Sequence, residues 1–256
     1  MLKQQLPRVL VGMPSHEIHR KVVACIIDLM LHVMRNTYVQ DISFRFRGDS
    51  IIARARMEMC QGAIEAGASH ILFVDSDQVF PATVLERLLH WRKPVVACNI
   101  PTKSTPSNST ARLFDLANPR QGRPLYTYHD SVGLKRVWRV GTGVMLIDLE
   151  MLRKLPKPWF LDKWVEADQM VQGEDWSFCE LLEVHNVPIF VDQRLSWDIG
   201  HIGDMEFQHC MVLAGYNMDE ANGKIKGVKD EEHSEARGEL LAAGNGELVG
   251  CVADAS

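Results

Sequence analysis

Three features are missing from this sequence of 256 residues: a long hydrophobic run, a paired-cysteine motif and a glycine-rich phosphate loop. Without a long apolar run or a secretory leader, the chain is expected to lack a membrane span and to be cytoplasmic. The six cysteines form no CxxC pair, which argues against a zinc finger and favours reduced core thiols. The sequence has no GxxxxGK[ST] pattern, which makes a P-loop NTPase the least favoured of the enzyme classes considered.

Charge is unevenly distributed along the chain. The formal net charge is -5, and residues 217–256 alone hold nine acidic and four basic side chains. The remaining body is therefore close to neutral and has no general attraction to nucleic acid, which is not expected as a partner. We predict one folded domain over residues 1–216, followed by a flexible, acidic, Gly/Ala-rich tail over 217–256.

The hydrophobic pattern predicts an α/β protein. Short apolar runs indicate strands at residues 8–12, 70–74, 94–98, 138–147 and 187–191, and helical periodicity indicates helices at 19–35, 51–66, 81–91, 149–155 and 174–185. Strands that alternate with helices predict a single Rossmann-like domain with a mostly parallel central sheet flanked by helices. In the first helix we expect a core-facing stripe of Val22, Val23, Ile26, Ile27, Met30 and Val33. Residues 100–136 are expected to form a long irregular connection that could close over a ligand.

Two carboxylates, Asp75 and Asp77, follow the apolar run of residues 70–74. In open α/β sheets, ligands bind outside the carboxyl ends of strands. Like charges at this spacing repel, so a divalent cation is the simplest partner, and oxygen ligands favour Mn²⁺ or Mg²⁺ over zinc. Such a cation would bridge the phosphates of a nucleotide. The alternative is that both aspartates only cap the turn that follows the strand.

The order of motifs along the chain resembles that of bacterial and phage family-2-like GT-A glycosyltransferases, over roughly residues 7 to 207. The matching elements are Val11-Gly12-Met13-Pro14-Ser15, Asp75-Ser76-Asp77, Gly141-Thr142-Gly143, Gly173-Glu174-Asp175 and Gly200-His201-Ile202-Gly203. The resemblance implies a GT-A fold. It also implies metal-dependent transfer of a sugar from a nucleotide-sugar of the UDP or GDP type to the hydroxyl of an unknown acceptor.

The resemblance also implies roles for individual residues. The metal site would comprise Asp75, Asp77 and His201, with Asp77 and His201 as direct ligands and Asp75 holding ribose or metal-bound water. Asp175 would be the general base of an inverting displacement, with Glu174 binding acceptor or donor sugar. The nucleotide-sugar would contact Pro14, Ser15, Glu17, Arg54, Arg56, Asp75, Ser76, Gly141, Thr142 and Gly143. Simpler readings remain for three of these motifs: a loop histidine at His201, a strand bulge at the glycines, and helix-dipole complementation at Glu174-Asp175.

Two other functions fit part of the pattern. Residues 71–79 also resemble the nucleophile motif of haloacid-dehalogenase-like phosphatases, in which Asp75 would attack phosphorus and Asp77 would act as acid and base. That family places the motif on its first strand and needs a later lysine, for which Lys154 and Lys163 are the candidates. The third possibility is a catalytically inactive nucleotide-sugar-binding module.

Overall fold

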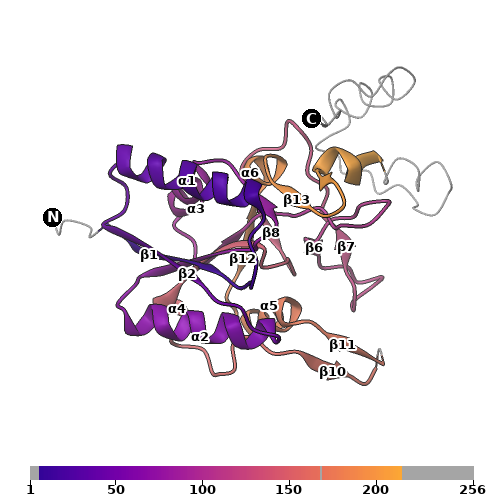
Figure 1. Cartoon of the computed structure of the whole chain (residues 1–256). Helices are drawn as coiled ribbons and strands as arrows, with labels where there is room; N and C mark the ends of the chain where they lie inside the picture. Colours follow the sequence, from indigo (N-terminus) through magenta and orange to yellow (C-terminus); the bar gives the residue numbers. More distant parts are fainter. Residues whose placement is uncertain (1–5, 168, 215–256) are drawn as a thin grey trace, which may run out of the picture.

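The computed structural model describes residues 6–167 and 169–214, which form a mixed α/β fold around a seven-stranded, mostly parallel sheet (Figure 1). The acidic segment expected over residues 217–256 lies outside the described residues. The sheet order is β2 (Asp41–Phe46), β1 (Arg8–Met13), β3 (His70–Val74), β9 (Val144–Asp148), β5 (Val95–Ala97), β12 (Ile189–Asp192) and β8 (Leu134–Val137).

The strand directions bring several connections to one edge of this sheet. β2, β1 and β3 are parallel to one another, as are β5 and β12, while β9 runs antiparallel to both β3 and β5. Strand β8 is the other antiparallel member. The carboxyl ends of β1, β3, β5 and β12 therefore lie at the same edge as the amino end of β9. This edge holds most of the residues singled out in the sequence.

Helices cover both faces of the sheet. On one face lie α1 (Arg20–Arg35), α3 (Val84–His90) and α6 (Gln193–Trp197), and on the other lie α2 (Ile52–Glu65), α4 (Leu149–Leu152) and α5 (Glu174–Val184) (Figure 1). In β3, Ile71 and Phe73 pack into the core on the α2 side, and Leu72 and Val74 into the core on the α1 side. Alternation of side chains along a strand thus fills two separate cores, which explains why this strand is apolar throughout.

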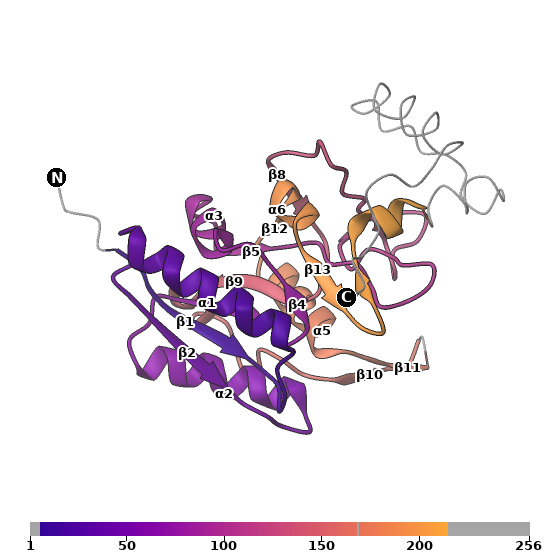
Figure 2. The same cartoon turned by 45° about the horizontal axis from the view of Figure 1, so that its top comes forward.

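Three small sheets lie beyond the carboxyl edge. The first joins β4 (Gln78–Val79) to β13 (Gly200–Ile202) and β14 (Glu206–Phe207). The others pair β6 (Arg112–Leu113) with β7 (Arg123–Pro124), and β10 (Lys163–Val165) with β11 (Met170–Gln172). Figure 2 shows β4 and β13 beside each other at the end of the molecule that carries α5, β10 and β11.

The expected elements are present, with some shifted bounds. The helix expected from Pro81 begins at Val84, and the strand expected over residues 138–147 begins only at Val144, after its two glycines. Residues 100–136 do contain only short strands, as expected. The elements that were not expected include the edge strand β2, whose side chains alternate between half-buried and exposed, and the five-residue helix α6. The short strands β4, β10, β11 and β14 were not expected either.

The core face of α1 differs from the expected stripe. Val22 and Ile26 are buried, but Val23, Ile27 and Met30 are 41%, 52% and 42% exposed. The prediction was therefore wrong for these three residues. Helix α1 contacts the sheet along one side only, so residues one position further round the helix face solvent despite being apolar.

The cysteines are mostly as expected. Cys60, Cys98 and Cys179 are buried free thiols and Cys25 is a half-buried one, whereas Cys210 is disulfide-bonded. The expectation of six reduced thiols is thus wrong at Cys210. Among the described residues, no helix combines the length and the apolar character that crossing a membrane requires.

Candidate functional site

A buried arginine connects two of the carboxylates at the carboxyl edge. Arg56 of α2 is 1% exposed and donates from Nε to Glu174 Oε1 over 3.0 Å and from Nη2 to Asp75 Oδ1 over 2.8 Å. Its guanidinium also lies 5.1 Å from the ring centroid of Phe73. Its Nη1 has no hydrogen-bond partner among the described residues. Arg56 therefore holds the end of β3 and the start of α5 together.

Arg54, the other arginine of α2 expected to reach a diphosphate, lies elsewhere. Its side chain is exposed and forms a two-point ion pair with Asp49, from Nε to Oδ2 and from Nη2 to Oδ1, each over 2.7 Å. Asp49 also accepts from the backbone N–H of Ile51, just before the helix begins. The structure therefore brings Arg56, and not Arg54, to Asp75.

Asp77 lies among cationic and polar side chains. Its Oδ1 is 3.5 Å from His201 Nε2 and accepts from Gln78 Nε2 over 3.3 Å, while its Oδ2 pairs with the ammonium of Lys103. Burial would raise the pKa of the Asp77 carboxyl, but the hydrogen bonds with His201 and Lys103 outweigh it and lower the pKa to about 2. Asp77 is therefore ionised over the whole physiological range.

The orientation of His201 is fixed by the backbone around it. Strand β13 pairs with β4 so that His201 is opposite Gln78, and Ile202 N–H donates to Asp77 O over 2.8 Å. His201 Nδ1 lies 2.8 Å from the carbonyl oxygen of Pro101. Because a carbonyl can only accept, Nδ1 carries a hydrogen, and Nε2 is the ring nitrogen that faces Asp77.

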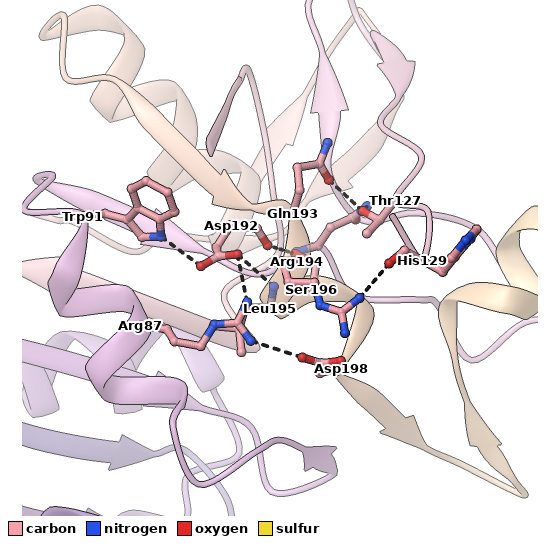
Figure 3. Close-up of polar contacts among 11 residues, drawn as sticks. Arg87, Trp91, Thr127, His129, Asp192, Gln193, Arg194, Leu195, Ser196 and Asp198 are labelled. Atoms are coloured by element: carbon pink, nitrogen blue, oxygen red, sulfur yellow. Dashed lines mark hydrogen bonds and ion pairs between the residues drawn. The ribbon is translucent and has the colours of Figure 1, made fainter. Parts of the chain in front are cut away.

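A polar network fixes the chain just before His201 (Figure 3). The buried Asp192, at the end of β12, caps α6 by accepting from Leu195 N–H and also accepts from Trp91 Nε1 over 2.8 Å. Arg87 of α3 pairs with both Asp192 and Asp198. These contacts hold both ends of α6, so the segment that leads into β13 has a defined position.

Asp175, the expected base, lies at the start of α5 beside Glu174. Burial and the neighbouring charge of Glu174 raise the pKa of Asp175 to about 6, against the opposing influence of a hydrogen bond from Trp176 N–H. A carboxyl with such a pKa exchanges a proton near neutral pH, as a general base must. Glu174 itself is buried and held by Arg56.

A pocket of about 540 Å³ opens next to this group of residues. It is lined by Pro14, Ser15, His16, Glu17, Asp49, Ser50, Ile51, Ile52 and Asp162. The pocket is connected to the strand-end motif, because Ser76 Oγ donates to Ser15 Oγ over 2.9 Å. Pro14, Ser15 and Glu17 thus line one open pocket, most of whose other lining side chains are polar.

The two glycines of the Gly141-Thr142-Gly143 segment differ in their surroundings. A Cβ on Gly143 would lie 2.8 Å from Ile100 Cδ1 and 3.1 Å from Asp75 Oδ2, whereas one on Gly141 would meet only ordinary contacts with Thr110. Asp75 N–H also donates to Gly143 O over 2.8 Å. Gly143 therefore lets β9 approach Asp75 closely. Thr142 Oγ1 is buried without a hydrogen-bond partner among the described residues.

The donor set at Asp77 and His201 fits a hard divalent cation. A carboxylate oxygen and an imidazole nitrogen are ligands that Mn²⁺ accepts. Their 3.5 Å separation is close to the roughly 3 Å between adjacent ligands of an octahedral cation with bonds of about 2.1 Å. No three His, Cys, Asp or Glu side chains gather as a metal site in the described part of the chain. The remaining positions would therefore be taken by phosphate oxygens and water, as is usual for Mg²⁺.

Sequence reasoning missed Lys103 and Asp162. Lys103 follows β5, whose carboxyl end lies at the same edge of the sheet as that of β3, so strand order would have placed it near Asp77 had the order been known. Asp162 lines the pocket from the connection before β10 and carries no such signal. The lysines required by a phosphatase reading are engaged elsewhere, Lys154 with Glu150 and Lys163 with Glu180.

Comparison with known proteins shows a shared fold and no family. No protein-family model matches the chain, and no curated protein matches it. Among solved structures the chain is similar to A197 from STIV, with 17% sequence identity, a TM-score of 0.53, and alignment over 80% of this chain and 91% of that one. At this identity the likeness shows a common fold alone.

Proposed function

We propose that this protein is a metal-dependent glycosyltransferase of the GT-A type that moves a sugar from a nucleotide-sugar to an acceptor hydroxyl. The observation that carries the proposal is the pairing of Asp77 with His201 at 3.5 Å, with the imidazole oriented by Pro101 O. A histidine whose second nitrogen binds a backbone carbonyl is the usual arrangement of a metal ligand.

The donor would lie between the pocket and this pair. Its nucleoside fits the pocket that contains Pro14, Ser15 and Glu17, which opens beside Ser76. Its diphosphate would then extend towards Asp77 and His201. A bound Mn²⁺ or Mg²⁺ would offset the charge that develops on the leaving diphosphate.

The carboxylates at the start of α5 fit the acceptor half of the reaction. Asp175 has its pKa raised to about 6, so it is mostly ionised at neutral pH and basic enough to accept the proton of an attacking hydroxyl. Arg56 binds both Glu174 and Asp75, so it would fix the position of the acceptor side of the site relative to the donor side. An inverting displacement is the mechanism that this arrangement supports best.

Nucleotide binding followed by donor hydrolysis tests the proposal. With Mn²⁺ present, UDP or GDP should raise the melting temperature of the wild-type protein, and a matching nucleotide-sugar should be hydrolysed slowly without an acceptor. Asp77→Asn and His201→Ala should abolish both effects. Asp130→Asn, at an exposed position, is the matched control and should change neither.

The result that would refute the proposal is release of phosphate from a simple phosphomonoester with an aspartyl adduct on Asp75. Nucleotide binding without turnover of any nucleotide-sugar would leave only a binding module.

A further inference from the structure

Lys103 is the lysine that forms an ion pair with Asp77. Its ammonium pairs with Asp77 Oδ2, on the carboxylate oxygen opposite the one that faces His201. Its alkyl stem lies against Gly203, where an added Cβ would be 3.3 Å from Lys103 Cδ. The side chain is 39% exposed, so it reaches Asp77 from solvent along the surface of the β13–β14 turn.

The backbone that carries Lys103 is firmly held. Asn99 is fully buried, and its amide accepts from Ser109 Oγ and Ala111 N–H and donates to Leu125 O and Thr127 Oγ1. Nearer to Lys103, Thr102 N–H donates to Asn108 O, and Thr102 Oγ1 accepts from Asn108 N–H. The Lys103 side chain can therefore move while its backbone stays in place, because it is exposed and its four-carbon stem is flexible.

A divalent cation and the Lys103 ammonium would compete for the same carboxylate. Asp77 carries one negative charge, and a cation bound beside Asp77 and His201 would repel an ammonium held on Oδ2. A lysine displaced from Asp77 would stay close, because its backbone is fixed. A diphosphate arriving with the cation supplies acceptor oxygens for it, and lysine is a common phosphate ligand.

We propose that Lys103 is a ligand of the donor diphosphate, and that its ammonium moves from Asp77 to the phosphate oxygens when a divalent cation takes its place. Only the part of this inference that concerns the diphosphate rests on the proposed function. Lys103 thus neutralises Asp77 before the cation binds and binds the diphosphate afterwards. One substitution should therefore change the affinities for metal and for nucleotide in opposite directions.

The experiment compares Lys103→Met with wild-type protein in two titrations. With Mn²⁺ alone, followed by electron paramagnetic resonance of the free ion, the variant should bind about two- to fivefold more tightly, the range expected when one exposed ion pair is removed. With GDP or UDP at saturating Mn²⁺, followed by calorimetry, it should bind about 10- to 100-fold more weakly, as expected for the loss of a hydrogen bond to a charged group.

Two further variants serve as controls. Lys103→Arg keeps the charge and should retain most of the wild-type behaviour in both titrations. Lys154→Met removes a lysine two residues after the end of α4, at the edge of the sheet opposite to Asp77, and should change neither affinity.

Each outcome decides one half of the proposal. Unchanged Mn²⁺ affinity in Lys103→Met would overturn the competition at Asp77, and tighter Mn²⁺ binding with unchanged nucleotide affinity would overturn the diphosphate role. If wild-type protein binds Mn²⁺ but neither nucleotide, the proposed function fails and takes the diphosphate role with it, while the metal titration still decides the competition.

Discussion

Arg56 Nε donates to Glu174 Oε1 over 3.0 Å, and both side chains are buried. The two residues are 118 positions apart in the sequence, and the same guanidinium also binds Asp75. A buried arginine between two carboxylates is stable only while all three are present, because each lone charge would be left in a medium that solvates it poorly.

Arg56→Met should destabilise the protein by about 3–5 kcal/mol, because it leaves Asp75 and Glu174 without their shared cation. Urea unfolding at pH 7 measures this. Arg54→Met is the matched control on the same helix, since the Arg54 side chain is 55% exposed, and it should leave the unfolding midpoint nearly unchanged. A small effect of Arg56→Met would mean that water or another cation reaches these carboxylates.

Asp175→Asn should stabilise the protein at neutral pH and not at low pH. The pKa of Asp175 is raised from 3.8 to about 6 in the folded state, so its ionisation is penalised by folding. Stability is therefore lost as the pH rises from 3.8 through about 6. Asn removes that loss, which is on the order of 3 kcal/mol above pH 7. Thermal unfolding of both proteins at pH 3.5 and 7.5 checks the sign.

The same ionisation predicts a pH profile for donor hydrolysis. If Asp175 is the base, kcat/KM should rise with pH through about 6 and reach a plateau above it. The Asp175→Asn variant should lose both the activity and this limb. A rising limb with the same midpoint in the variant would assign the proton transfer to another group.

Asn99→Ala should loosen the segment that carries Pro101 and Lys103. The substitution leaves Ala111 N–H and Leu125 O without their buried partner, at a stability loss of roughly 2–4 kcal/mol. Limited proteolysis should then cut within residues 100–111 faster than in wild-type protein. Asn108→Ala, an exposed residue of the same segment, should have a much smaller effect on both measurements.

Val22 and Val23 provide a matched test of how α1 packs. Val22 is 0% exposed and Val23 is 41% exposed. Val22→Ala should lower the free energy of unfolding by about 2 kcal/mol, through lost burial and the cavity left behind. Val23→Ala should change it by less than about 0.5 kcal/mol. Equal effects would mean that another surface covers Val23 in solution.

The sequence predicted the fold best where a whole strand is apolar because both of its faces are buried. The continuous apolar run of β3 identified a strand buried on both faces, and its end located Asp75 and Asp77. Strand β2 was missed because its edge position leaves its side chains half exposed, without an uninterrupted apolar run. The partners of Arg56 could not be predicted, because they are far away in the sequence. Glu174 is 118 residues from Arg56 and Asp75 is 19 residues from it, and only the packing of α5 and β3 against α2 brings them together.

The position of β9 has a consequence for biosynthesis. This strand lies between β3 and β5, yet follows both in the chain, since β5 ends at Ala97 and β9 begins at Val144. Until it emerges from the ribosome, a nascent chain holds β3 and β5 as two unpaired apolar edges, which are the kind of surface that associates with other chains. We therefore expect the nascent protein to need less protection by chaperones once β9 has emerged, and least once β12, the other neighbour of β5, has followed.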